Sequence, residues 1–271
     1  MSQNANPLSA SEPWNLVAIG YAETTMLIFE QYADEAIAAS HLKPGAMVLD
    51  VACGPGTLAL KLACNAGQVH AIDFSPAMLA IFKQKIEQAG HGNITLRCGD
   101  AQSLPYPDNY FDAAFSLFGL MFFPDRNKGF AEIQRSLKPG GSIAVTSWAP
   151  IDQSPAMQIM FGALRAIKPE LAQPQRSIAT LEDPGTFKRE MNAAGFKNME
   201  IRLITKVFPV TTIPAFWETM VKGSAPIQMM KKELGDRWPE KEKIALAYLK
   251  QALPRIPTEL TSDAWLGTGN K

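Results

Sequence analysis

The stretch "VLDVACGPGTLALKLA" (residues 48–63) decides the fold. An apolar, β-rich run stops on the turn Gly54-Pro55-Gly56, and the chain resumes at once with helical spacing of apolar residues. Glycines let a backbone approach a ligand with no Cβ in the way, and the N-terminus of the following helix offers free N–H groups. A simple chain reversal needs neither feature. The stretch therefore predicts a ligand-binding turn between a buried strand and a helix.

Strands and helices alternate on both sides of this turn. Apolar runs bounded by turn residues predict strands, and helical spacing with capping signals predicts helices between them. The expected strands are residues 47–52, 69–73, 94–98, 111–117 and 142–148, and the expected helices are 57–65, 75–90 and 126–137. Such βαβ units with short connections predict a parallel sheet covered by helices on both faces.

The flanking segments predict further elements. They are a helix over 21–40 before the turn and, after Trp148, helices over 154–167 and 184–196, a strand over 199–210, two or three helices within 214–253 and a last strand over 263–271. Because no Gly/Ser-rich linker separates these parts, we expect residues 1–271 to form a single domain.

The composition limits the partners and the location. Lys+Arg and Asp+Glu both number 26, so no basic excess exists to bind nucleic acid, and a small-molecule substrate is favoured. The longest apolar stretch, residues 113–123, is too short to cross a bilayer. The polar N-terminus lacks the features of a signal peptide, and the three cysteines form no CxxC pair. We expect a cytoplasmic protein with reduced thiols and no membrane insertion; the oligomeric state stays open.

Acidic side chains follow the second and third strands. Asp73 ends the second strand 19 residues after Gly54, the place where a carboxylate accepts hydrogen bonds from a ribose diol. Asp100 follows the third strand and can accept from an exocyclic amino group such as that of adenine. Phe74 and Met78 could sandwich the base. These residues predict an adenosine-containing ligand at the carboxyl edge of the sheet.

Two cofactor classes fit the turn itself. "GPGTLA" satisfies the dinucleotide pattern G-x-G-x-x-G/A through Ala59, so one interpretation of the motif is an NAD(P)-dependent oxidoreductase. The features that distinguish the two classes lie elsewhere in the chain: Asp100, the "LKPGG" before the fifth strand, and the terminal strand.

Five segments in order resemble the class I S-adenosylmethionine-dependent methyltransferases, of the group similar to the ubiquinone/menaquinone C-methyltransferases. They are "VLDVACGPGTLA", "VHAIDFSPAML", "CGDAQSLPYPDNYFD", "FSLFGLMFFPD" and "RSLKPGGSIAVTSW". The resemblance covers residues 45–150. It implies S-adenosylmethionine as cofactor, S-adenosylhomocysteine as product, and methyl transfer to a small molecule as the activity.

The resemblance also implies which residues contact the cofactor. The residues around its methionine part would be Tyr21, Asp50, Ala52, Gly54 and Gly56. Asp73 would bind its ribose, and its adenine would contact Phe74, Met78, Asp100 and Ala101. Ser116 and Leu117 would lie near its sulfonium. The family often has glycine where this chain has Ala52, which adds only slight bulk to the turn.

For the fold, the resemblance implies a Rossmann-like α/β sheet of seven strands with helices on both faces. Its last strand would run antiparallel, between the fifth and the sixth. The implied parts are a helical lid (1–44), a cofactor-binding core (45–150), segments that complete the sheet (151–210 and 256–271) and a helical substrate cap (211–255).

Methyl transfer from this cofactor needs little from the protein beyond correct placement of the acceptor. A protein that holds a nucleophile in line with an activated methyl group and excludes water needs no general base for an amine, a phenolate-like oxygen or an enol carbon. No histidine stands out as a catalyst and no metal-ligand spacing occurs, so we name no catalytic residue and expect no metal.

Apolar and aromatic residues after the fourth and fifth strands and in the cap are the candidate substrate contacts. They are Phe118, Met121, Trp148, Phe216, Trp217 and Met220. They favour a hydrophobic or aromatic acceptor. Besides the oxidoreductase, a non-catalytic S-adenosylmethionine-binding module is the other alternative.

Overall fold

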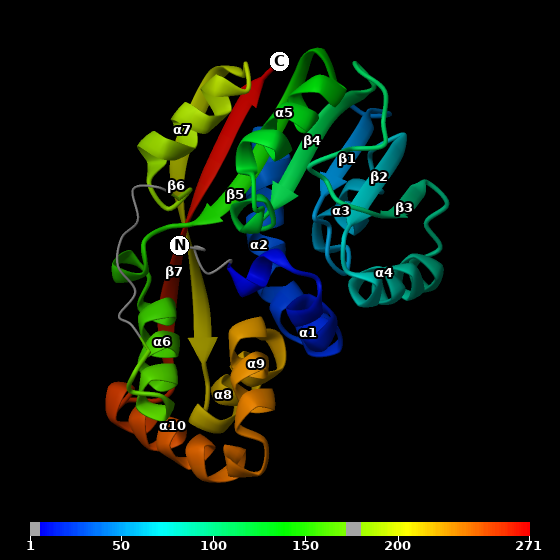
Figure 1. Ribbon diagram of the computed structural model, residues 1–271. Helices are drawn as coiled ribbons and strands as arrows, with labels where there is room; N and C mark the ends of the chain where they lie inside the picture. The colour runs from blue at the N-terminus through cyan, green and yellow to red at the C-terminus, as the bar shows by residue number, and fades with distance from the viewer. Residues whose placement is uncertain (1–5, 172–179) are drawn as a thin grey trace, which may run out of the picture.

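The computed structural model describes residues 6–171 and 180–271 (Figure 1). Two short pieces of the predicted parts lie outside the described residues: 1–5, the start of the predicted lid, and 172–179, within the predicted segment 151–210.

Seven strands form one sheet in the order β3-β2-β1-β4-β5-β7-β6. Their bounds are β1 Met47–Val51, β2 Gln68–Asp73, β3 Ile94–Cys98, β4 Phe111–Leu117, β5 Leu137–Trp148, β6 Lys197–Val210 and β7 Thr258–Asn270. The first five strands pair in parallel, whereas β7 runs antiparallel to both β5 and β6, between which it lies. The predicted Rossmann-like sheet with an antiparallel last strand is confirmed.

Helices cover both faces of the sheet (Figure 1). The α-helices are α1 Glu12–Glu23, α2 Thr25–Ala39, α3 Thr57–Leu62, α4 Pro76–Ala89, α5 Arg126–Ser136, α6 Pro155–Ile167, α7 Pro184–Ala193, α8 Ile213–Gly223, α9 Ala225–Leu234 and α10 Trp238–Ala252. Short 3-10 helices are η1 Pro7–Ser9, η2 Leu120–Phe122, η3 Ile151–Gln153 and η4 Gly235–Arg237. One core joins the sheet to α2, α3 and α4, and a second joins its other face to α5 and α7.

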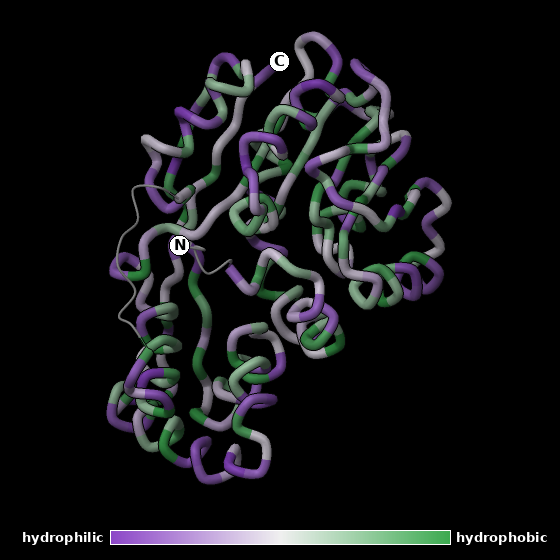
Figure 2. The backbone as a smooth tube through the Cα atoms, viewed as in Figure 1, coloured by the Kyte–Doolittle hydropathy of each residue, from purple (hydrophilic) through white to green (hydrophobic). Residues whose placement is uncertain are grey.

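Strand alternation explains the two cores. On β1, Val48 packs in the core beneath α2 and α3, while its neighbour Leu49 packs in the core beneath α5. Both side chains are fully buried, as expected for a central parallel strand. Figure 2 shows green concentrated along the central strands and purple mostly on the outer turns of the helices.

The prediction of one N-terminal helix over 21–40 is wrong. The structure has two helices, α1 and α2, which meet at Thr24, where the backbone leaves the helical region (φ −126°, ψ −66°). The sequence hides α1 because its buried side is only Pro13, Val17 and Ala18, a small set that shows little helical periodicity. Its position is set by contacts with α4, α8 and α9 rather than by its own pattern.

Two strands, β5 and β7, begin five residues earlier than predicted. β5 starts at Leu137, which pairs with Phe111, and the next pair is Ser142 with Ala113, so the predicted "KPGG" turn bulges out between these two pairs. β7 starts at Thr258 instead of residue 263, because its first residues pair with the end of β6.

The long strands β6 and β7 reach beyond the rest of the sheet and connect it to a helical region (Figure 1). There α6, α8, α9 and α10 share a third apolar core. Residues 211–255 contain three α-helices, α8, α9 and α10, where the sequence predicts two or three. Within the described ranges, none of the helices combines the length and apolarity that a membrane crossing requires.

Candidate functional site

The glycine turn lies at the carboxyl end of β1, with α3 beginning directly after it. Gly54 and Gly56 have left-handed backbones (φ +53° and +93°), a conformation that glycine adopts without strain. A Cβ on Gly56 would lie 2.2 Å from the Phe82 ring, whereas a Cβ on Gly54 would meet no atom within 4 Å. Gly56 therefore serves packing against α4, and Gly54 leaves space beside the turn.

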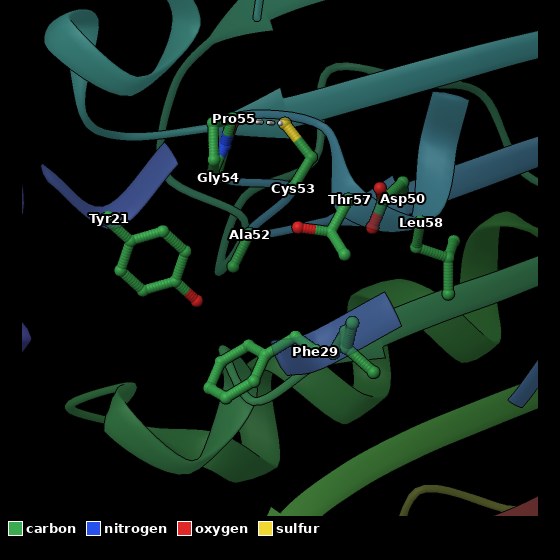
Figure 3. A pocket seen from close by; sticks show the side chains of 10 residues that line it. Tyr21, Phe29, Asp50, Ala52, Cys53, Gly54, Pro55, Thr57 and Leu58 are labelled. Atoms are coloured by element: carbon green, nitrogen blue, oxygen red, sulfur yellow. Dashed lines mark hydrogen bonds between the residues drawn. The ribbon is translucent and has the colours of Figure 1, made fainter. Parts of the chain in front are cut away.

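A pocket opens on this turn, between the sheet edge and the first two helices (Figure 3). It is lined by Tyr21, Phe29, Asp50, Ala52, Cys53, Gly54, Pro55, Thr57, Leu58 and Leu117. About 20 Å³ of it is open to a water molecule. Figure 3 shows the Tyr21 and Thr57 hydroxyls directed into the same space.

Asp50 is the least satisfied polar group of the pocket. Its side chain is 1% exposed, and neither carboxylate oxygen has a hydrogen-bond partner among the described residues. Burial and then the Asp73 charge raise the pKa of Asp50 to about 8, against the opposing effect of the Ala59 N–H. A buried carboxylate without a partner is costly unless a cation or donor reaches it. Asp50 therefore suits the amine of a bound ligand.

Asp73 is fixed by the backbone around it. One of its carboxylate oxygens accepts a hydrogen bond from the Gly54 N–H and the other from the Ser75 N–H, both at 2.8 Å. Burial raises the pKa of Asp73, and these N–H groups counteract the rise. Each oxygen keeps a lone pair that can accept from a ribose hydroxyl. With Asp50 and the open side of Gly54, the residues present fit S-adenosylmethionine.

The other two titratable groups of the pocket stay neutral. Burial, followed by the Asp73 charge, raises the pKa of the Tyr21 phenol. Burial, followed by the charges of Asp73 and Asp50, raises the pKa of the Cys53 thiol well above its usual value. Tyr21 can therefore donate a hydrogen bond but is a poor base, and Cys53 is a poor nucleophile.

The end of β4 forms one wall, and its two predicted residues point to opposite sides. Leu117 lines the pocket, whereas the Ser116 hydroxyl accepts from the Leu120 N–H at 3.1 Å and does not line it. Ala52 also lines the pocket, with a left-handed backbone (φ +55°). A Cβ on Gly119 would lie 2.2 Å from the Ala52 Cβ. The methyl group of Ala52 is thus accommodated by a glycine across the site.

The predicted adenine contacts lie farther along the same edge. Phe74 is 36% exposed, and the Asp100 carboxylate, also exposed, accepts from the Gln102 backbone N–H at 2.8 Å. Ala101 is buried in the core beneath α5. Met78 is buried against Val17, Ala18 and Ala225, beneath α1. None of these four predicted residues lines the pocket of Figure 3.

The predicted substrate contacts fall into two groups. Phe118 and Trp148 stack with ring centroids 4.1 Å apart, inside an aromatic cluster with Phe29 and Tyr32. Met121 packs at the edge of both cores of the sheet.

The three cap residues lie in a separate core. Trp217 is 3% exposed, stacks on Trp238 and donates from Nε1 to Glu242. Phe216 and Met220 are half-buried on the surface of the same core. The structure therefore does not bring the cap residues into one pocket with Phe118 and Trp148.

Sequence reasoning missed Phe29, Cys53, Pro55, Thr57 and Leu58 as pocket residues. Four of them belong to the glycine turn or the first turn of α3, so the motif itself could have indicated them. Phe29 carries no such signal, because α2 reaches the site only through its packing on the sheet.

The geometry defines a class: an α/β protein with a pocket at the carboxyl edge of a sheet whose last strand is antiparallel. Residues 48–141 match the methyltransferase domain family. The ubiquinone/menaquinone biosynthesis C-methyltransferase UbiE of Francisella tularensis subsp. holarctica is 34% identical over 186 residues, which are 63% of this chain and 74% of that protein.

Another relative and a solved structure agree with this family assignment. The demethylmenaquinone methyltransferase of Staphylococcus saprophyticus is 33% identical over 61% of this chain and 76% of its own. The crystal structure of the YcgJ protein from Bacillus subtilis superposes with a TM-score of 0.60, at 19% identity over 89% of this chain and 98% of that one, and supports the fold. The chain belongs to the class I S-adenosylmethionine-dependent methyltransferases, and the oxidoreductase alternative is set aside.

Proposed function

We propose that the pocket between the glycine turn and α1 binds S-adenosylmethionine, and that the enzyme methylates a small hydrophobic or aromatic acceptor. The observation that carries this proposal is Asp50, a buried carboxylate that lines the pocket and has no hydrogen-bond partner among the described residues. The bound cofactor would supply a methyl group activated by a sulfonium, with a neutral sulfide as leaving group.

The residues of the pocket then have separate tasks. Asp50 would hold the amine of the cofactor, and Asp73 its ribose. Tyr21 and Phe29 would exclude water from the reacting centre, because both line the pocket from the side of α1 and α2. Since Tyr21 and Cys53 are poor bases, the acceptor would have to be nucleophilic by itself, as an electron-rich ring carbon, a phenolate or an amine is.

Two observations favour an aromatic acceptor. The aromatic cluster of Phe29, Phe118 and Trp148 adjoins the cofactor pocket through Phe29, which belongs to both. The two relatives are named for quinone methylation. A reduced quinone ring would offer an electron-rich carbon to the methyl group.

Calorimetric titration with S-adenosylhomocysteine tests the cofactor assignment. The wild-type chain should bind it in the micromolar range, and Asp73→Asn should weaken binding at least about 100-fold, because a charge-assisted acceptor is lost. Asp236→Asn, at an exposed position in η4, is the matched control and should bind as wild type does. Absence of binding to the wild-type chain would refute the assignment.

Mass spectrometry of candidate acceptors tests the second part of the proposal, the methylation of an aromatic acceptor. A short-chain demethylmenaquinol, kept reduced, should gain one methyl group in the presence of S-adenosylmethionine. Methylation of simple alkylamines but not of the quinol would contradict the aromatic acceptor. Binding of cofactor with no methylation of any acceptor would favour the non-catalytic module.

A further inference from the structure

Helix α1 lies between α4 on one side and α8 and α9 on the other (Figure 1). Val17 and Ala18 of α1 bury against Met78 of α4 and Ala225 of α9. Tyr21, on the same helix, lines the cofactor pocket. The position of α1 therefore decides where Tyr21 lies.

Asn15 connects α1 to the start of α4. Its Oδ1 atom accepts hydrogen bonds from the Ser75 hydroxyl at 2.7 Å and from the Ala77 N–H at 3.3 Å. The Ser75 oxygen in turn accepts from the Met78 N–H at 3.2 Å, so its proton is free to point at Asn15. Both groups facing Asn15 are donors, which assigns the oxygen rather than the amide nitrogen to this position. In the described ranges, these are the side-chain hydrogen bonds that join α1 to α4.

The Asn15 contact bears directly on the cofactor site. Ser75, which Asn15 holds through its side chain, donates its backbone N–H to Asp73. On the other side of α1, Gly20 lies so close to α8 that a Cβ there would be 2.3 Å from the Lys222 carbonyl oxygen. The cap side of α1 is thus fixed by close packing. The side toward α4 combines the apolar contacts of Val17 and Ala18 with Met78 and the two hydrogen bonds of Asn15.

The pocket beside the turn is narrow while α1 lies in this position: about 20 Å³ of it is open to water. Tyr21 lines it from α1 and Phe29 from α2, so the position of α1 sets how much space remains for a ligand at the turn. The contacts of Asn15 hold α1 in that position.

We propose that Asn15 is a positioning residue: its two hydrogen bonds to the start of α4 hold α1, and with it Tyr21, over the bound cofactor. The proposal rests on the proposed function, since it takes S-adenosylmethionine as the ligand. It adds a residue outside the sheet-edge motifs, one that acts through Ser75 and Tyr21 without touching the cofactor.

Three variants of the full-length chain test it by binding of S-adenosylhomocysteine and by its dissociation rate in stopped flow. Asn15→Ala should raise both the Kd and the dissociation rate about tenfold, because both hydrogen bonds are lost. Asn15→Asp keeps an acceptor at the N-terminus of α4 and should stay within about threefold of wild type. Leu16→Ala, at the exposed neighbouring position, should leave both quantities unchanged.

Thermal unfolding without ligand separates positioning from folding. Loss of the two hydrogen bonds outweighs the better helix propensity of alanine, so Asn15→Ala should unfold only a few degrees below the wild type and stay folded at the temperature of the binding assay. If Asn15→Ala binds S-adenosylhomocysteine with wild-type affinity, or if Asn15→Asp does not restore that affinity, the role of Asn15 is refuted and the proposed function is not affected. Failure of the wild-type chain to bind S-adenosylhomocysteine would overturn it together with the proposed function.

Discussion

The pocket at the sheet edge and the helical cap differ in the hydrogen bonding of their buried polar groups and in their backbone conformation. In the pocket, Asp50 has no partner among the described residues, and Ala52 has a left-handed backbone. In the cap, residues 211–255, which are all described, include no non-glycine residue with positive φ, and the Trp217 N–H is paired with Glu242. Strain and unpaired polar groups persist where a ligand can use them. The difference supports the proposed cofactor site at the sheet edge, whereas the cap core is fully packed and hydrogen-bonded at Trp217.

Removal of a cap tryptophan gives the largest expected effect. Trp217→Ala should lower the free energy of unfolding by about 3–5 kcal/mol, because it empties a buried site that stacks on Trp238. Urea unfolding measures this. S-adenosylhomocysteine should still bind to the folded fraction with wild-type affinity. Phe216→Ala, at the half-buried neighbour, should cost clearly less stability. If Trp217→Ala weakens binding in the folded state, the cap and the pocket are not separate.

The two glycines of the turn should respond in opposite ways. Gly56→Ala should cost about 2–4 kcal/mol of unfolding free energy, because its Cβ would meet the Phe82 ring and its backbone is left-handed. Gly54→Ala should cost about 1 kcal/mol, yet weaken S-adenosylhomocysteine binding more strongly than its effect on stability would suggest, because its Cβ would enter the open space beside the turn. Chemical unfolding and calorimetry compare the two. Equal effects on binding would contradict separate roles.

Ala52 and Gly119 should behave as a coupled pair. Gly119→Ala should destabilise the protein by about 1–3 kcal/mol, because its Cβ would lie 2.2 Å from that of Ala52. Combination with Ala52→Gly should recover most of this loss, which a double-mutant cycle measures as a coupling energy. Additive effects of the two substitutions would show that their contact is not the cause.

The pH dependence isolates Asp50. Because its folded-state pKa is about 8 and a carboxyl in the unfolded chain titrates near 4, the folded protein holds an extra proton between these values. The free energy of unfolding should therefore fall as pH rises from 4 to 8, by up to about 1.4 kcal/mol per pH unit from this group.

Asp50→Asn should remove that contribution, which urea unfolding at pH 5 and pH 7.5 would detect. Calorimetry in buffers of different ionisation enthalpy should also find proton release when S-adenosylhomocysteine binds at pH 7 to the wild type but not to Asp50→Asn. The same pH slope in both proteins would refute the assignment to Asp50.

The order of elements in the sheet could be predicted because its signals are local. Apolar runs, the cap at Ser75 and the glycine turn each depend on neighbours in the sequence, and the structure reproduces them. The break at Thr24 and the bulge after Leu137 could not be predicted, because they depend on which strand or helix packs alongside. A short amphipathic pattern does not show which element will pack against it.

The same distinction holds for the pocket. Tyr21, Asp50, Ala52, Gly54 and Leu117 are predicted to contact the cofactor and line the pocket, whereas Gly56 and Ser116, predicted with them, do not line it. Asp73 was predicted for the ribose from its spacing to Gly54, and the two residues share a hydrogen bond. The contact of each with the cofactor stays a prediction, as do the adenine and acceptor contacts.

The sequence by itself determined the strand, turn and helix that form the cofactor edge, because residues 48–63 contain both the apolar strand and the glycines that the turn requires. It also determined the family, through motifs that follow one another along the chain. Only the tertiary structure decided that Phe29 lines the pocket, that Asn15 reaches Ser75 from α1, and that Trp217 belongs to the cap core. Those contacts join segments far apart in the chain, and packing alone selects them.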